Sequence, residues 1–226
     1  MMSTENNTTV LITGANRGIG LALCKAYLKK GFTVIAVCRQ SSQDLQLLSL
    51  EVVDQVDVSS AQGIAHLKKS IANRNIDILI NNAGILRNQT FNNLDYEEIT
   101  EQFIVNTLGP IRVVEALFQS LSEGSKVAFV TSRMGSIKDN TSGGSYGYRM
   151  SKCALNIAGK SMAVDFKSKG IAVAILHPGY VQTEMVNFGG EISTELSANR
   201  LADRIDQLTI ENSGTFWHSN GEVLPW

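Results

Sequence analysis

Short apolar runs alternate with segments of helical spacing along most of the chain. The runs predict β-strands at residues 10–12, 33–38, 52–58, 76–80, 126–131, 171–176 and 215–217. Apolar positions that recur every three or four residues predict helices at 18–30, around 64–71, and at 96–121, 150–166 and 194–211. Gly31 is expected to end the first helix, and Pro110 to kink the longest one or to mark tight packing.

Strands that alternate with helices of this length are typical of a parallel sheet with helices on both faces. Right-handed connections between the strands then give a doubly wound, Rossmann-like α/β fold. The 226 residues suit one such domain, and no repeat, linker or low-complexity segment divides them. We therefore expect a single domain over residues 1–226.

The composition narrows the classes of partner. A net charge of −1 and the lack of a basic patch argue against nucleic acid and anionic membranes. No apolar run approaches the ~18 residues that a membrane span needs. The first residues, MMSTENNTT, are too polar for a secretory signal. The three cysteines, Cys24, Cys38 and Cys153, are scattered and odd in number, which is typical of reduced thiols. We expect a cytoplasmic protein.

A glycine-rich segment at 13–20, TGANRGIG, follows the first predicted strand and opens the first predicted helix. Gly14 allows a tight turn, Gly18 lets the backbone approach a pyrophosphate at the helix N-terminus, and Gly20 permits close helix packing. This placement predicts a dinucleotide site. Its candidate cofactor contacts are Gly14, Asn16, Arg17, Gly18, Ile19 and Gly20.

The end of the second predicted strand bears on which dinucleotide binds. NAD enzymes commonly place an acidic residue there to bind the ribose 2′-hydroxyl. This chain has Cys38 at that position, followed by Arg39. Two guanidinium groups, those of Arg17 and Arg39, favour a 2′-phosphate and hence NADP(H) over NAD(H). The alternative is that Arg39 is only a solvated surface residue.

Two further strand ends carry candidate cofactor contacts. Asp57 and Val58 end the third predicted strand, where the Asp57 carboxylate either binds the adenine amino group or caps the following helix. Asn82, Ala83 and Gly84 follow the fourth predicted strand. Small residues there let the backbone run beside a cofactor, and the asparagine also stabilises the sheet edge.

Tyr148 and Lys152 form a Y-x-x-x-K pair, and residues four apart share one face of a helix. An adjacent cation lowers the pKa of a phenol, so that Tyr148 can exchange a proton with a carbonyl or an alcohol. Ser132 ends the fifth predicted strand, where a hydroxyl can hydrogen-bond a substrate oxygen. Asn106 lies inside the long predicted helix, where an interruption could extend a proton relay from Lys152. Ser132 could equally be a turn residue, and Asn106 simply tolerated.

In chain order, TGANRGIG, NNAG, Asn106, Ser132, the Tyr148–Lys152 pair and HPG at 177–179 resemble the short-chain dehydrogenase/reductase family. The resemblance covers essentially the whole chain. Within the family, VTSRMGSI, YGYRMSKCALN and the C-terminal segment 214–226 most resemble the C-factor and sniffer-like carbonyl reductases.

The resemblance implies roles for individual residues. Tyr148 would be the catalytic acid and base, and Ser132 would orient the substrate carbonyl. Lys152 would lower the pKa of Tyr148 and bind the nicotinamide ribose, and Asn106 would hold Lys152 through a water. The adenosine and pyrophosphate side would be lined by Gly14, Arg17, Ile19, Asp57, Val58, Asn82, Ala83 and Gly84. The nicotinamide side would be lined by 178–183, including Pro178, Gly179, Val181 and Thr183.

The resemblance also divides the domain into a cofactor half, about 8–125, and a catalytic and substrate half, about 126–226. It implies a homodimer or homotetramer that pairs through the helices carrying Asn106 and Tyr148, where Ala154, Ala158 and Ala163 would suit close packing. The spacing from Ser132 to Tyr148 is longer than in many members. Residues 136–146 are therefore expected to bulge over the site.

The ordered set predicts an NADPH-dependent reductase of a small ketone, aldehyde or quinone. Two alternatives stay open: an NADP(H)-binding regulatory protein with little turnover, and an NAD-dependent alcohol dehydrogenase. His177 is expected to be a hydrogen-bonded structural histidine. Met134, Met150 and Met185 flank the site loops, where they either line a pocket or fill the core.

Overall fold

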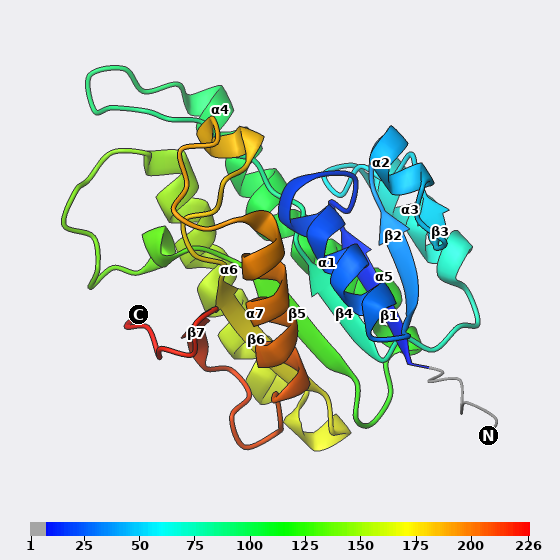
Figure 1. The fold of residues 1–226 in the computed structure, drawn as a ribbon. Coiled ribbons are helices and arrows are strands. Elements are labelled where there is room, and N and C mark those ends of the chain that lie inside the picture. Colours follow the sequence, from blue (N-terminus) through cyan, green and yellow to red (C-terminus); the bar gives the residue numbers. More distant parts are fainter. Residues whose placement is uncertain (1–7) are drawn as a thin grey trace.

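The computed structural model describes residues 8–226 and contains one seven-stranded sheet, all of whose neighbouring strands are parallel (Figure 1). The strand order is β3-β2-β1-β4-β5-β6-β7. The strands are β1 (Thr9–Thr13), β2 (Thr33–Val37), β3 (Glu51–Val53), β4 (Ile78–Asn81), β5 (Lys126–Val130), β6 (Ala172–His177) and β7 (Phe216–His218). The order reverses between β1 and β4, which is where doubly wound sheets open a ligand crevice at the carboxyl ends of their strands.

Helices cover both faces of this sheet, as the alternation of strands and helices predicted. On one face α1 (Gly18–Lys29) packs beside α7 (Thr194–Asp206), and Figure 1 shows the two in front of the strands. Leu23 of α1 and Leu201 of α7 are fully buried there against the sheet. The opposite face holds α3 (Ala61–Ile71), α5 (Gly109–Leu117) and α6 (Tyr146–Asp165), which bury Leu67, Val113 and Leu155. The predicted doubly wound Rossmann-like fold is confirmed.

The helix predicted at 96–121 is present but interrupted. It consists of α4 (Tyr96–Phe103), a π-helical turn at Ile104–Leu108, and then α5 and a 3₁₀ turn at Phe118–Ser120. The Asp95 side chain caps the start of α4 by accepting from the backbone N–H groups of Glu97 and Glu98. Pro110 lies in the first turn of α5 and has no N–H to donate to the carbonyl four residues earlier. Its position immediately after the π turn agrees with the expected break in the helix.

Several boundaries differ from the prediction. The third strand, expected at 52–58, ends at Val53, because Gln55 has a φ of 56° and turns the chain. Asp57 and Val58 therefore lie beyond the strand. The helix expected at 150–166 begins already at Tyr146, which places Tyr148 in its first turn, and the last helix ends at Asp206. The structure adds a short α2 (Gln43–Gln46) that the apolar pattern did not indicate.

Further short 3₁₀ turns occupy Arg133–Gly135, Lys167–Lys169 and Glu184–Val186, and the last of these is labelled η5 below. Within residues 8–226, no helix is both long and apolar enough to span a bilayer. The three cysteines are free thiols. We do not expect the polar segment MMSTENNTT to be a secretory signal. Most of it, residues 1–7, lies outside the described residues.

Candidate active site

A cavity of about 1480 Å³ opens at the carboxyl ends of the strands, between the glycine-rich segment and η5. It collects residues from both halves of the chain, and of the predicted site residues only Gly20 and Asn106 do not line it. Those that do are Gly14, Asn16, Arg17, Gly18, Ile19, Arg39, Asp57, Val58, Asn82, Ala83, Gly84, Ser132, Tyr148, Lys152, Pro178, Gly179, Val181 and Thr183.

The glycine-rich segment leaves the N-terminus of α1 open toward the cavity. Gly14 and Gly18 have φ angles of 66° and 54°, which side chains disfavour, and a Cβ on Gly14 would lie 2.8 Å from the Ala83 Cα. A Cβ on Gly20 would collide with the Gly14 carbonyl. Arg17 is the N-cap of α1, yet among residues 8–226 no side chain accepts from the first-turn N–H groups, and the first turn has no acidic residue. Free donors at the positive end of a helix fit the pyrophosphate of a dinucleotide.

Two polar side chains brace this segment. The Asn16 Nδ2 donates to the Gln40 carbonyl at 3.0 Å, and the Ser42 hydroxyl donates to the Asn16 carbonyl at 2.6 Å. On the other side, the Asn82 Nδ2 donates to the carbonyls of Thr13 and Gly14, each at 3.1 Å. Asn16 and Asn82 thus hold the backbone of the glycine-rich segment in place.

Thr13 is a residue that sequence reasoning missed. Its Oγ1 accepts from the backbone N–H groups of Asn82 and Ala83, at 3.1 and 3.2 Å, and so ties β1 to the end of β4. Its position directly before Gly14 was the available signal. Asn81 differs from Asn82, because both polar atoms of its amide are buried with no partner among the described residues.

At the end of β2, Arg39 is exposed and lines the cavity, whereas Cys38 is buried. Burial raises the pKa of the Cys38 thiol to about 11. The Asp57 Oδ1 accepts from the Ser59 N–H and hydroxyl, at 2.8 and 2.6 Å. Burial alone would raise the pKa of Asp57, but these hydrogen bonds and the charge of Arg39 lower it. The side-chain cap of α3 is Ser60, so Asp57 braces the turn before that helix while its side chain borders the cavity.

Ser132, Tyr148 and Lys152 lie together and are all buried. The Ser132 hydroxyl caps the 3₁₀ turn by accepting from the Met134 N–H at 3.1 Å, and it also hydrogen-bonds the Tyr148 hydroxyl. The Lys152 Nζ lies 5.7 Å from the centroid of the Tyr148 ring and donates to the Val130 carbonyl at 3.1 Å. The helical spacing thus brings phenol and ammonium together, as predicted.

The pKa of Tyr148 moves in the direction opposite to the one expected. Burial raises it to about 12, although the hydrogen bond with Ser132 acts to lower it. Burial also lowers the pKa of Lys152 to about 8. The cost of desolvating the phenolate therefore outweighs the hydrogen bond with Ser132, and the Lys152 ammonium is not among the causes of the shift.

Asn106 is fully buried in the π-helical turn. Its Oδ1 accepts from the Ile85 N–H at 2.8 Å, and its Nδ2 donates to the Ile85 carbonyl at 2.9 Å and to the Ser151 hydroxyl at 3.1 Å. A Cβ on Gly84 would lie 3.2 Å from the Asn106 Oδ1 and 3.5 Å from the Lys152 Nζ. Asn106 and Lys152 therefore face the same small space beside Gly84.

The cavity is also lined by residues that the sequence did not single out, among them Leu86, Phe188 and His218. Met134 and Met185 also line the cavity, but Met150 is about half exposed and lies outside it. The expectation that His177 is hydrogen-bonded through its ring is wrong for Nδ1, which is buried without a partner among the described residues. The ring instead packs edge-to-face on His218.

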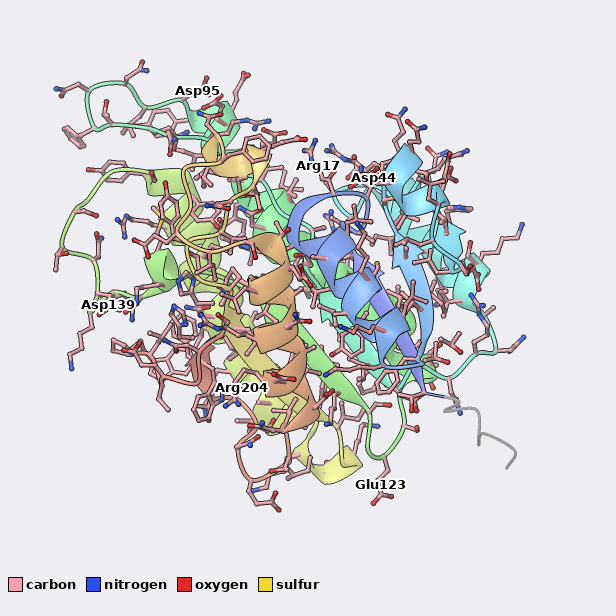
Figure 2. The ribbon with its side chains drawn as sticks, viewed as in Figure 1. Arg17, Asp44, Asp95, Glu123, Asp139 and Arg204 are labelled. Carbon is pink, nitrogen blue, oxygen red and sulfur yellow. The ribbon has the colours of Figure 1, made fainter. Side chains whose placement is uncertain are left out.

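The segment 136–146 does not cover the site. None of residues 136–146 lines the cavity. In Figure 2 Asp139 lies on a loop that projects away from Arg17. The Ser136 hydroxyl and the Lys138 N–H both donate to the Trp226 carbonyl, at 3.0 and 2.9 Å. These bonds hold the start of the loop against the C-terminal segment instead of over the cavity.

Residues 8–191 match the family model described as short chain dehydrogenase. The chain belongs to the short chain dehydrogenase family. It is therefore an oxidoreductase, as the ordered motifs predicted. The chain is 40% identical over 225 residues to 1-hydroxy-2-glutathionyl-2-methyl-3-butene dehydrogenase of Rhodococcus sp. (strain AD45). The aligned region covers 97% of this chain and 100% of that protein. It is 42% identical over 154 residues to C-signal of Myxococcus xanthus, over 67% of this chain and 93% of that protein.

Solved structures agree with this assignment. Carbonyl reductase Sniffer of D. melanogaster has a TM-score of 0.87 and 28% identity, over 98% of this chain and 100% of that one. A carbonyl reductase from Pseudomonas aeruginosa PAO1 in complex with NADP has a TM-score of 0.87 and 34% identity, over 98% of this chain and 100% of that one. The expected resemblance to C-factor and sniffer-like reductases is confirmed.

Proposed function

We propose that this oxidoreductase is an NADPH-dependent reductase of small carbonyl compounds. We also propose that it is a single domain, with a cofactor half at about 8–125 and a catalytic and substrate half at about 126–226. The observation that carries the proposal is the buried group of Ser132, Tyr148 and Lys152 on the wall of a cavity that also contains the open N-terminus of α1. The carbonyl reductases among the solved structures support it.

The cofactor would lie along the carboxyl ends of the strands. The first-turn N–H groups of α1 would bind its pyrophosphate, and Asp57, Val58 and the 82–84 backbone would border its adenosine side. Arg17 and Arg39 would hold a 2′-phosphate, and Pro178, Gly179, Val181 and Thr183 would border the nicotinamide. The bound NADP complex of a similar reductase supports the choice of NADP(H).

The chain's own residues would orient the substrate and supply the proton. Ser132 and Tyr148 would hydrogen-bond the substrate carbonyl oxygen and so polarise its carbon. NADPH, when bound, supplies the hydride that this carbon accepts. Because its pKa is raised, Tyr148 is protonated at neutral pH and can transfer its hydroxyl proton to the oxygen. Lys152, charged below about pH 8, would stabilise the phenolate that remains. Asn106 would position Lys152.

The direct test replaces Tyr148 by Phe and follows NADPH oxidation with quinone and aldehyde substrates. Loss of at least about a hundredfold in kcat, with NADPH binding retained, is expected for removal of a general acid. Tyr146→Phe is a matched control in the same helix turn, and should leave turnover unchanged. Unchanged turnover in Tyr148→Phe would refute the mechanism. Tight NADPH binding without turnover on a broad carbonyl panel would favour the regulatory alternative.

One observation favours the opposite direction of reaction, alcohol oxidation, at the same site. The relative from Rhodococcus is named as a dehydrogenase of a hydroxy compound, so alcohol oxidation is the second candidate. The residues would serve the reverse reaction with reversed proton transfer, in which Tyr148 takes the alcohol proton. Initial rates with primary and secondary alcohols and either NADP⁺ or NAD⁺ separate the two directions.

We also propose that two copies pair through α6. Its exposed apolar residues Met150, Ile157 and Val164 are 49%, 63% and 67% exposed and stand seven positions apart, on one helix face. Ala163, expected to serve this packing, is instead buried in the chain's own core. Light scattering should show a dimer or tetramer that Ile157→Glu dissociates. A wild-type monomer would refute the pairing.

A further inference from the structure

The imidazoles of His177 and His218 form part of the cavity wall, and neither takes part in the proposed hydride and proton transfer. β6 and β7 run side by side, and their register pairs His177 with His218. Both side chains line the cavity. Two positions earlier, Ile175 and Phe216 pack together, and Ile175 lies under α6 at Gly159. Because side chains two apart on a strand share a face, both imidazoles lie on the α6 side, the side that carries Tyr148.

The orientation of the His218 ring is set by a turn. Its Nδ1 accepts from the Asn220 N–H at 3.0 Å, and its backbone carbonyl accepts from the Gly221 N–H at 2.9 Å. The His177 ring packs against it at 4.8 Å between centroids and 83° between planes. In a neutral imidazole with Nδ1 as acceptor, the proton is on Nε2. The described residues offer Nε2 no hydrogen-bond partner, so His218 keeps one free N–H donor.

Both imidazoles are uncharged near neutral pH. Burial lowers the pKa of His218, and the charge of Arg133 lowers it further. Burial, His218 and Arg133 lower the pKa of His177 to about 3. The donor that His218 offers is therefore a neutral N–H, which brings no positive charge that could pair with a carboxylate.

The nearby cation, Arg133, is not free to pair with a carboxylate either. Arg133 directly follows Ser132, but its guanidinium is already paired with Asp139 and Glu222, each at 3.2 Å. Apolar side chains of Met134, Met185 and Phe188 line the same cavity. The cavity that His218 lines thus offers apolar surface as well as this neutral donor.

We propose that His218 is a specificity-determining residue whose Nε2–H binds a second, uncharged oxygen of the substrate. The favoured substrates are dicarbonyl compounds, in which one carbonyl oxygen meets Ser132 and Tyr148 and the adjacent oxygen meets His218. This inference rests on the proposed carbonyl reductase activity and deepens it, because it assigns the recognition of the non-reacting oxygen to this residue.

The test compares 1-phenyl-1,2-propanedione with propiophenone, which lacks the second carbonyl. His218→Phe keeps an aromatic ring but removes the donor, and His218→Gln keeps an N–H donor. His66→Phe is a control on the exposed part of α3. His218→Phe is expected to lower kcat/KM for the dione about tenfold and for propiophenone less than twofold, with the Kd for NADPH unchanged. His218→Gln should recover part of the dione activity, and His66→Phe should match the wild type.

Equal losses on both substrates in His218→Phe, or no loss on the dione, would overturn the role of His218 while leaving the reductase proposal intact. Absence of turnover of both ketones by the wild-type enzyme would overturn the two together. If His218→Phe does not fold, as judged by circular dichroism, His218→Leu provides the second donor-free variant, and the same selective loss is required of it.

Discussion

The Arg17 Nη1 lies 3.0 Å from the Glu184 Oε2, so an ion pair between two residues that line the cavity joins the N-cap of α1 to η5. Figure 2 shows Arg17 at the top of α1. The two side chains are 67% and 59% exposed, which limits the energy of the pair to that of a screened surface interaction. The pair nevertheless occupies a guanidinium that we assign to the 2′-phosphate.

Glu184→Gln is expected to tighten NADPH binding. It frees Arg17 and removes a negative charge near the phosphates, which together are worth about twofold to fivefold in Kd at low salt. NADH, which lacks the 2′-phosphate, should respond less. Titration of cofactor fluorescence measures both. Glu195→Gln removes an equal charge elsewhere on the cavity wall and should change the NADPH Kd by less than Glu184→Gln does. Weaker NADPH binding in Glu184→Gln would contradict the competition.

Arg39→Asp should exchange the cofactor preference. Loss of a charge-assisted hydrogen bond to the 2′-phosphate, worth about 1.5–3 kcal/mol, lowers kcat/KM for NADPH by about tenfold to a hundredfold. The new carboxylate can instead accept from the ribose 2′-hydroxyl of NADH. Arg87→Asp removes the same charge at an exposed residue that does not line the cavity, and serves as the control. An unchanged ratio of NADPH to NADH efficiency would show that Arg39 is only solvated.

The pH dependence should follow Lys152. Its pKa, lowered by burial to about 8, leaves the ammonium charged below that pH and neutral above it. Tyr148, with a pKa raised to about 12, stays protonated throughout this range. Carbonyl reduction should therefore be constant at acid pH and fall about tenfold in kcat/KM between pH 7 and pH 9. Lys152→Arg keeps its charge, so whatever activity it retains should lack this falling limb. A profile flat to pH 10 in the wild type would refute the assignment.

Asn106 and Thr107 provide a matched pair of buried hydrogen-bonding residues in the π-helical turn. Asn106 faces the space shared with Lys152, whereas the Thr107 hydroxyl donates to the Ser151 carbonyl at 2.8 Å. Each alanine variant should lose about 1–3 kcal/mol of unfolding free energy. Only Asn106→Ala should also lose about tenfold in kcat, with a shift in the pH profile. Equal kcat in the two variants, measured beside urea denaturation, would make Asn106 purely structural.

Much of the fold could be predicted because local patterns encode it. Alternating apolar runs and helical periods predicted the parallel sheet, since strands buried on both faces must be continuously apolar. The glycine spacing predicted the open N-terminus of α1, and the four-residue spacing of Tyr148 and Lys152 predicted their contact, because backbone geometry alone sets both.

Long-range packing decided the rest. The His177–His218 contact joins residues 41 positions apart and depends on the β6–β7 register, and the Arg17–Glu184 pair depends on how η5 approaches α1. The rise in the pKa of Tyr148 requires its burial, which helical spacing does not report. The direction of the 136–146 loop follows from its bonds to Trp226. The sequence by itself determined most of the elements and the candidate site residues. The tertiary structure determined their neighbours, because burial, charge and register arise only when distant segments pack.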